Sequence, residues 1–232
     1  MEVFISGQKY FGESVYFLCK KLGFKIVGVC APIGDKYLYR SAIRDGVMII
    51  PAGTLNAENM PACDLGITAH SFDYIGKKTR YKAKLGWLGY HPSLLPRHRG
   101  RSAIEWAIRM GDAITGGTVF WLNGGIDRGD IALQDFCFIP KEYQLSPKDG
   151  AAKLWRETLC DMGLSLYERV LTDVKNGVIN KTAQDKRFST FEPSLDGVKD
   201  IFKPDLLLIE YDAGSGAAET DIAFDEEYIP HH

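Results

Sequence analysis

Residues 89–100 read GYHPSLLPRHRG, and this stretch decides how the chain is expected to fold. It continues an apolar run, residues 85–90, that is typical of a buried strand. The residue before a proline is driven toward extended conformations, so His91 is expected at the carboxyl end of that strand. Parallel α/β sheets bind ligands beyond the carboxyl ends of their strands, which places His91 for chemistry. A lone histidine beside a strand is more often structural, and this residue alone leaves that alternative open.

Short apolar runs alternate with helical patterns on both sides of this stretch. Strands are predicted at residues 3–7, 24–30, 47–51, 64–68, 85–90 and 118–122 and from 131, and helices at 10–22, 35–46, 102–110 and 147–175. Such alternation predicts an α/β fold: a doubly wound, Rossmann-like, mostly parallel sheet with flanking helices. We expect one domain over residues 1–178 and a short C-terminal appendage, residues 179–232, with an acidic tail.

Cysteine usage and apolar content limit the class of protein. The five cysteines, at positions 19, 30, 63, 137 and 160, are odd in number and form no CxxC pair. This favours reduced, buried thiols, a cytoplasmic setting and no metal site, with a reactive thiol as the alternative. The chain starts with a strand pattern in place of a leader, and no apolar run is long enough for a membrane span. The loop after the first strand lacks the GxGxxG spacing, so no nicotinamide cofactor is expected.

Charge is distributed unevenly. Eight of the 30 Asp and Glu residues follow Lys203, whereas all 28 Lys and Arg residues lie at or before that position. A mildly basic body suits a small anionic ligand better than a long nucleic acid, which usually needs a stronger basic stripe. For the acidic tail itself, a solvated surface is the preferred interpretation.

A second motif, GIDRGD at residues 125–130, completes a recognisable pair with His91-Pro-Ser-Leu-Leu-Pro. Together the two motifs resemble the folate-dependent formyltransferases, a family that includes methionyl-tRNA formyltransferase, glycinamide ribonucleotide formyltransferase and the hydrolase domain of 10-formyltetrahydrofolate dehydrogenase. The resemblance covers roughly residues 1–175. It is strongest to the hydrolase domain, which shares residues 90–100, a Ser-Ala-Ile-x-Trp like residues 102–106 and a Phe-Trp pair like residues 120–121.

The resemblance implies 10-formyltetrahydrofolate as the formyl donor and assigns roles to particular residues. It implies that His91 stabilises the oxyanion of the tetrahedral intermediate and that Asp127 orients a water or the histidine and relays the proton. It also places Asp73, Tyr74 and Ile75 in the loop that lies against the folate pterin. The structural alternatives are an Asx turn at Asp127 and, at residues 73–75, an ordinary loop with Phe72 in the core.

One position departs from the formyltransferases. They carry an asparagine two residues before the histidine, where its amide helps to hold the formyl oxygen, and this chain has Gly89 there. Losing one such donor typically lowers the rate by about 10² to 10³. The hydrolase domain also departs from asparagine at this site. We expect Gly89 to leave a hole that a water fills, so the sequence permits both transfer and hydrolysis.

The leading functional hypothesis is therefore an enzyme that moves a formyl group to the amine of a small molecule, such as a nucleotide-linked sugar. The alternatives are hydrolysis of the same donor to formate and a non-catalytic folate- or nucleotide-binding module. The basic residues 97, 98, 99 and 101 are either a seat for an anionic acceptor or ion-paired with the sheet. No tRNA-binding domain is recognised after residue 175, so tRNA is not the expected acceptor. The oligomeric state is left open.

Overall fold

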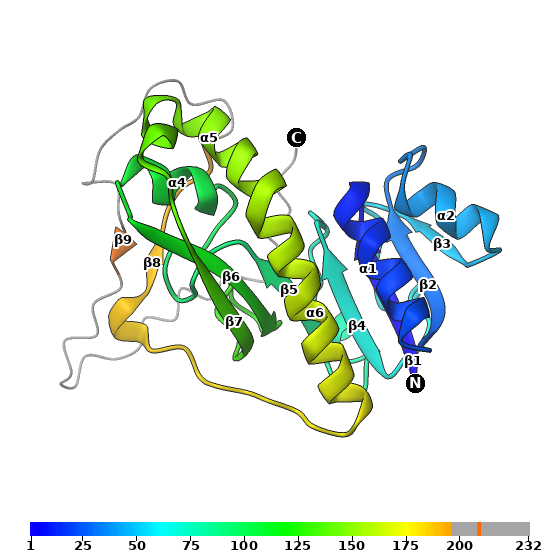
Figure 1. The fold of residues 1–232 in the computed structure, drawn as a ribbon. Coiled ribbons are helices and arrows are strands. Elements are labelled where there is room, and N and C mark those ends of the chain that lie inside the picture. Colours follow the sequence, from blue (N-terminus) through cyan, green and yellow to red (C-terminus); the bar gives the residue numbers. More distant parts are fainter. Residues whose placement is uncertain (196–207, 210–232) are drawn as a thin grey trace.

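The computed structural model describes residues 1–195 and 208–209, so most of the predicted acidic tail lies outside the described residues. The strands are β1 (Glu2–Gly7), β2 (Lys25–Ala31), β3 (Ile49–Pro51), β4 (Leu65–Ala69), β5 (Trp87–His91), β6 (Ile114–Trp121), β7 (Ile131–Phe138), β8 (Thr190–Phe191) and β9 (Leu208–Ile209). The α-helices are α1 (Lys9–Lys21), α2 (Leu38–Arg44), α3 (Lys77–Arg80), α4 (Ala103–Arg109), α5 (Pro147–Leu154) and α6 (Cys160–Lys175), with short 3₁₀ turns at Lys141–Leu145 and Lys186–Phe188 (Figure 1).

Seven strands form one sheet in the order β3-β2-β1-β4-β5-β6-β7. The neighbours from β3 to β5 run parallel, whereas β6 and β7 are antiparallel to their neighbours. The chain starts in the middle of the sheet, builds outward to β3 and then returns to build the other side from β4. The doubly wound, mostly parallel α/β sheet predicted from the sequence is confirmed.

The two faces of the sheet are covered differently. Side chains alternate along a strand, so Val3 and Ile5 point to one face and Phe4 to the other. On the first face α1 and α6 lie over the sheet (Figure 1), and the core includes Val3, Ile5 and residues of both helices such as Val15 and Val170. On the second face a smaller cluster joins Phe4 and Trp87 to Met60, Cys63, Ile75 and Ala83, which come from connecting segments. Loops and the four-residue helix α3 therefore cover much of the face that carries Trp87.

The helix predicted over residues 147–175 is interrupted. A π-helical turn, Trp155–Leu159, separates α5 from α6. The Tyr90 hydroxyl on β5 donates a hydrogen bond of 2.7 Å to the Leu159 carbonyl at the end of this turn. Such turns are often found at functional sites, and an inserted side chain is one of the recognised causes of helix irregularity. Trp155 consequently packs between two core clusters.

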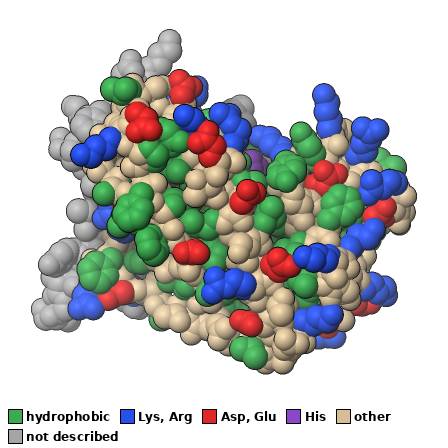
Figure 2. All heavy atoms as spheres, viewed as in Figure 1, with side chains coloured by type: hydrophobic (Ala, Val, Ile, Leu, Met, Phe, Trp, Pro, Cys, Tyr) green, Lys and Arg blue, Asp and Glu red, His purple; other side chains and the backbone are tan. Residues whose placement is uncertain are grey.

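The surface carries charge on one side and apolar side chains on the edge strand. Lys and Arg side chains crowd the part of the molecule over α1 and α2 (Figure 2). On β7, Phe136 and Phe138 are exposed and their rings meet edge to face at 6.1 Å. Within the part of the chain that the structure describes, no helix is both long and apolar enough to cross a membrane.

Candidate active site

His91 is the last residue of β5, at the carboxyl edge of the parallel strands, as predicted. Its ring is 7% exposed. Nε2 lies 2.6 Å from the main-chain carbonyl oxygen of His98. Because a carbonyl oxygen only accepts hydrogen bonds, this contact places a proton on Nε2. The other ring nitrogen, Nδ1, faces the Asp127 carboxylate, with 3.6 Å between Nδ1 and Oδ2.

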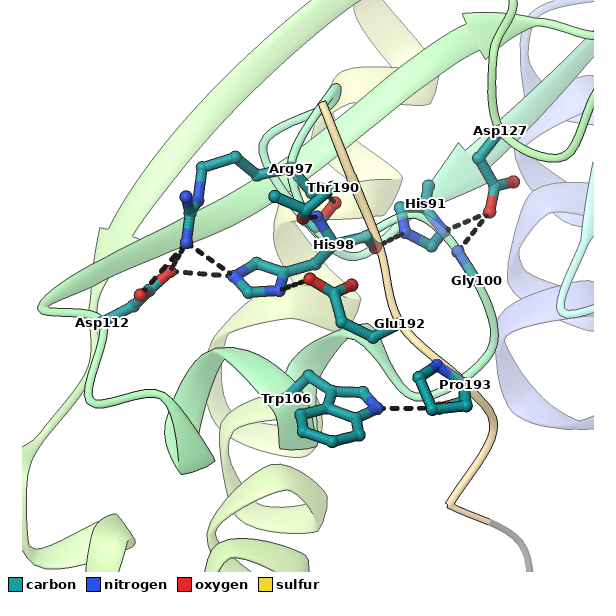
Figure 3. A network of polar contacts seen from close by, with 11 residues as sticks. His91, Arg97, His98, Gly100, Trp106, Asp112, Asp127, Thr190, Glu192 and Pro193 are labelled. Carbon is teal, nitrogen blue, oxygen red and sulfur yellow. Dashed lines mark hydrogen bonds and ion pairs between the residues drawn. The ribbon is translucent and has the colours of Figure 1, made fainter. Parts of the chain in front are cut away.

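Asp127 reaches His91 by a route that the sequence did not indicate. The two residues do not lie on adjacent strand ends, because β6 runs antiparallel to β5 and its last residue pairs with Leu88, near the start of β5. The β6–β7 loop must therefore fold back to bring Asp127 to His91 (Figure 3). Asp127 adopts φ = 52° within that loop, and its Oδ2 accepts a 2.9 Å hydrogen bond from the Gly100 amide. The carboxylate thus connects the turn after His91 with its own loop.

The expected hole beside Gly89 is filled, and that expectation was wrong. A Cβ at this position would lie 2.8 Å from Leu122 Cδ1, 3.0 Å from Thr68 Oγ1 and 3.1 Å from Phe120 Cε1. Protein interiors are close-packed, so an asparagine fits here only if Leu122 moves. Gly89 itself offers no side-chain donor to a formyl oxygen.

The side chains of Asp73, Tyr74 and Ile75 point in different directions. The Asp73 carboxylate is turned toward the ends of β1 and β3, where it accepts hydrogen bonds from the Ser6 hydroxyl (3.1 Å) and the Gly53 amide. Ile75 is 5% exposed in the smaller core cluster, whereas Tyr74 is 68% exposed. Asp73 and Ile75 therefore hold the loop in place. Contact of these three residues with the pterin stays a prediction.

Phe72 is 67% exposed, so the structural alternative that placed it in the core is wrong. Its ring sits 5.7 Å from His70 and 5.0 Å from the Arg101 guanidinium. Burial, and then the positive charge of Lys9, lower the pKa of His70, which keeps that ring neutral near pH 7. An aromatic surface with two cations nearby, Lys9 and Arg101, therefore lies beyond the strand ends.

The remaining residues of the basic cluster are mostly tied into the protein. His98 is 2% exposed; its ring lies 2.8 Å from Asp112 Oδ2 and 3.1 Å from Glu192 Oε1. Burial alone would lower the pKa of His98, but its hydrogen bonds to the two carboxylates outweigh burial and raise it. Arg97 also pairs with Asp112, at 3.1 Å (Figure 3). Of the two interpretations of residues 97–101, ion pairing inside the fold therefore describes Arg97 and His98.

Sequence reasoning did not identify Asp112, Gln184 or Glu192 as parts of this neighbourhood. Glu192 meets His98 across 94 positions of sequence, and Gln184 meets Arg99 across 85. The one sequence signal for this region is that polar residues follow several strands. The backbone conformation of these residues is a second, structural signal. Lys9, His70, His98 and Asp127 all adopt positive φ between 52° and 56°. Such backbone conformations are uncommon for residues other than glycine and concentrate at functional sites.

The thiols of Cys19 and Cys63 are buried and are not available as nucleophiles. Burial raises the pKa of Cys19 to about 12 and that of Cys63 to about 11, so neither thiol supplies a thiolate near neutral pH. Among the described residues, no group of three or more His, Cys, Asp and Glu side chains is arranged to hold a metal ion. The structure does bring together His91 and Asp127, the two residues predicted to be catalytic.

Comparison with known proteins agrees with this arrangement. Residues 54–149 match the family model described as formyl transferase. Mouse cytosolic 10-formyltetrahydrofolate dehydrogenase is 30% identical over 208 residues, which cover 83% of this chain and 22% of that protein. This chain therefore spans about a fifth of the length of that relative.

Solved structures share the fold. Glycinamide ribonucleotide transformylase 1 from Symbiobacterium toebii superposes with a TM-score of 0.66 at 20% identity, covering 79% of this chain and 93% of that one. An N-formyltransferase from Helicobacter canadensis, solved with folinic acid and dTDP-3-aminofucose, gives 0.64 at 17% identity, covering 82% and 69%. The resemblance to the folate-dependent formyltransferases is thus confirmed, and residues 54–149 match the model of a formyl transferase domain.

Proposed function

We propose that this chain takes the formyl group of 10-formyltetrahydrofolate and transfers it to the amine of a small molecule. The observation that carries this proposal is the pairing of His91 with Asp127, 3.6 Å apart, in a domain of the formyl transferase family. The amine nitrogen attacks the formyl carbon and gives a tetrahedral oxyanion. The bond from that carbon to N10 of the folate then breaks, and the proton lost by the amine ends on N10. The products are a formamide and tetrahydrofolate.

His91 and Asp127 divide this chemistry between them. With Nε2 engaged by the His98 carbonyl, Nδ1 is the nitrogen left to meet the reacting group. Once Nδ1 has also taken up a proton, His91 offers Nδ1–H to the developing oxyanion, and the Asp127 carboxylate balances the positive charge that forms on the ring. Asp127 also takes the proton that the attacking amine releases, directly or through a water. Neither residue needs a metal for these steps.

Hydrolysis of 10-formyltetrahydrofolate to formate is the second candidate. It is favoured by Gly89, which supplies no amide donor, and by the similarity to 10-formyltetrahydrofolate dehydrogenase. In this reaction a water replaces the amine, the formyl carbon leaves as formate, and N10 again receives a proton. His91 and Asp127 keep the same roles, so the two reactions differ only in the nucleophile that reaches the formyl carbon.

Residues near the proposed site indicate which class of acceptor molecule to test first. Arg101 lies over the aromatic ring of Phe72, and the positive charge of Lys9 acts on the neighbouring His70, which suits a small molecule with a phosphate group and a flat ring. The similar N-formyltransferase from H. canadensis was solved with a nucleotide-linked amino sugar. Nucleotide-linked amino sugars are therefore the first acceptors to test.

The deciding experiment incubates the full chain with 10-formyltetrahydrofolate alone and follows tetrahydrofolate and formate. Turnover above the protein-free rate that is lost in His91→Ala supports hydrolysis. Tight folate binding without turnover points to a missing acceptor, and adding amino sugars should then release tetrahydrofolate and form a formamide. Binding without turnover under every condition would leave a non-catalytic binding module. Normal turnover in His91→Ala would refute the proposed chemistry.

A further inference from the structure

Residues 182–193, which we name the C-terminal strap, return from the end of α6 to two loops: the β6–β7 loop that carries Asp127 and the turn that follows His91 (Figure 1). Main-chain hydrogen bonds join the Thr182 amide to the Ile131 carbonyl (2.9 Å) and the Arg99 amide to the Thr190 carbonyl (3.1 Å). The strap therefore touches β7, which follows the loop of Asp127, and also the turn that follows His91. It lies outside the residues matched to the formyl transferase family, 54–149.

Gln184 links the two loops with all of its side-chain polar atoms. Its Nε2 donates to the carbonyl oxygens of Asp127 and Gly129, both at 2.7 Å. Its Oε1 accepts from the Arg99 guanidinium, at 2.8 Å from Nη2 and 3.2 Å from Nε. One amide side chain thus fixes the main chain of Asp127 relative to the segment that begins at His91.

Glu192 acts on the other member of the pair, through His98. The Glu192 carboxylate and Asp112 hold the His98 ring from its two sides, and Thr190 Oγ1 accepts from the His98 amide at 2.8 Å (Figure 3). These contacts fix the His98 main chain, whose carbonyl oxygen is 2.6 Å from His91 Nε2. That carbonyl decides which nitrogen of His91 carries the proton.

From these contacts we propose that the C-terminal strap is a positioning element: Gln184 sets the main chain of Asp127, and Glu192, through His98, sets the tautomer of His91. The inference rests on the proposed function for its effect on turnover. Asp127 and His98 adopt positive φ, at 52° and 54°, and each is fixed by a strap residue. For residues other than glycine this conformation is unfavourable, so the loops need such contacts to stay in place.

One of the two carboxylate oxygens of Glu192 is in a position that is unfavourable for stability. Its second oxygen, Oε2, is buried and meets no donor among the residues that the structure describes. A buried polar atom left without a hydrogen bond lowers stability. Strain and unsatisfied groups of this kind are expected where geometry serves chemistry.

The test uses two isosteric variants in the full chain, Gln184→Glu and Glu192→Gln. The first replaces the donating amide with a carboxylate that faces two carbonyl oxygens, and the second removes the charge that balances His98. Asp185→Asn is the matched control, because Asp185 lies in the strap but pairs with Arg187. We expect kcat to fall by roughly 10- to 100-fold in both variants, as is typical when partners that orient a reacting group are lost. KM and folate affinity should change less than about twofold, and the control should match the wild type.

Nitrogen-15 spectra of histidine-labelled protein provide a readout that needs no turnover. The chain has five histidines, and the His91 signals are those that disappear in His91→Ala. We expect a single Nε2-protonated form in the wild type and in Asp185→Asn, and a mixture of tautomers in Glu192→Gln. Unchanged His91 signals in Glu192→Gln, or an unchanged kcat in both strap variants, would overturn the inference. If the wild type shows no turnover but the tautomer still shifts, the proposed function fails and the positioning role stands.

Discussion

Position 89 offers a direct test of how tightly the site is packed. Replacing Gly by Ala inside a strand ordinarily stabilises a protein by roughly 0.5–1 kcal/mol, because the unfolded chain loses freedom. Here the added Cβ would lie 2.8 Å from Leu122 Cδ1 and 3.1 Å from Phe120 Cε1. Overpacking of this kind costs about 1–3 kcal/mol. We therefore expect Gly89→Ala to lower the free energy of unfolding, the opposite of the usual sign.

Thermal and urea unfolding measure this effect. For a chain of this size, about 1 kcal/mol corresponds to a Tm change of roughly 2–4 °C. Overpacking net of the unfolded-state gain is then expected to lower Tm by up to about 10 °C. Leu122→Val removes Cδ1, the atom nearest to the new methyl group, and serves as the second arm of a double-mutant cycle. Gly89→Ala should cost less in the Leu122→Val background than in the wild type. A stability gain from Gly89→Ala, or additive effects of the two changes, would refute the packing argument.

The filled space beside Gly89 also affects how transfer and hydrolysis can be distinguished at this position. Gly89→Asn alone introduces an amide that has no room, whereas the double change Gly89→Asn and Leu122→Ala provides the space. If the amide then holds the formyl oxygen, the ratio of transfer to hydrolysis should rise, by up to about 10²-fold. An unchanged ratio in a well-folded double variant would show that position 89 does not discriminate between the two reactions.

Three further predictions follow from other parts of the fold. The ring of His98 faces Asp112, Glu192 and Arg97 and has a raised pKa, so its contribution to stability is full below its ordinary pKa of 6.5 and is lost as the pH rises through the raised value. The difference in the free energy of unfolding between wild type and His98→Gln, measured by urea unfolding, should therefore shrink above the raised pKa. A difference that stays constant with pH would contradict this. Tyr90→Phe removes the donor to the buried π-turn and should cost about 1–3 kcal/mol; a variant as stable as the wild type in the same assay would show that the carbonyl finds another partner. The thiol of Cys19 is fully buried, so in the native protein it should react with a thiol reagent only after unfolding, and rapid labelling in buffer would contradict its burial.

The sequence was sufficient for the sheet and for His91 because both depend on local signals. Apolar runs alternating with helical patterns predict parallel strands, and the His91-Pro92 pair places the histidine at a strand end. Asp127 was found through its motif, but its path was not, because the antiparallel course of β6 depends on strand pairing and leaves little trace in local composition. The filled space beside Gly89 was missed for a similar reason, since Leu122 enters it from another strand end.

The contacts of Gln184 and Glu192 could not be predicted from sequence motifs. Each is an ordinary polar residue in a segment of weak pattern, and its partner lies 85 or more positions away. Only the path of the chain after α6 brings them to the loops around His91 and Asp127. Asp112 was missed as well, although it lies only 14 positions from His98, because a polar residue at a helix end is ordinarily solvated.

The return of the strap to residues 96–100 also sets an order of events during biosynthesis. A ribosome adds about 5–20 residues per second and domains fold as their segments emerge, so the strands and helices up to α6 are available before residues 184–192 are. The contacts that fix His98 and Asp127 join positions up to 94 apart and form only after this late segment has left the exit tunnel. A nascent chain can therefore hold a nearly complete sheet while His91 and Asp127 are still unaligned. The two side chains are then brought into register at the end of synthesis, in a step separate from the folding of the sheet.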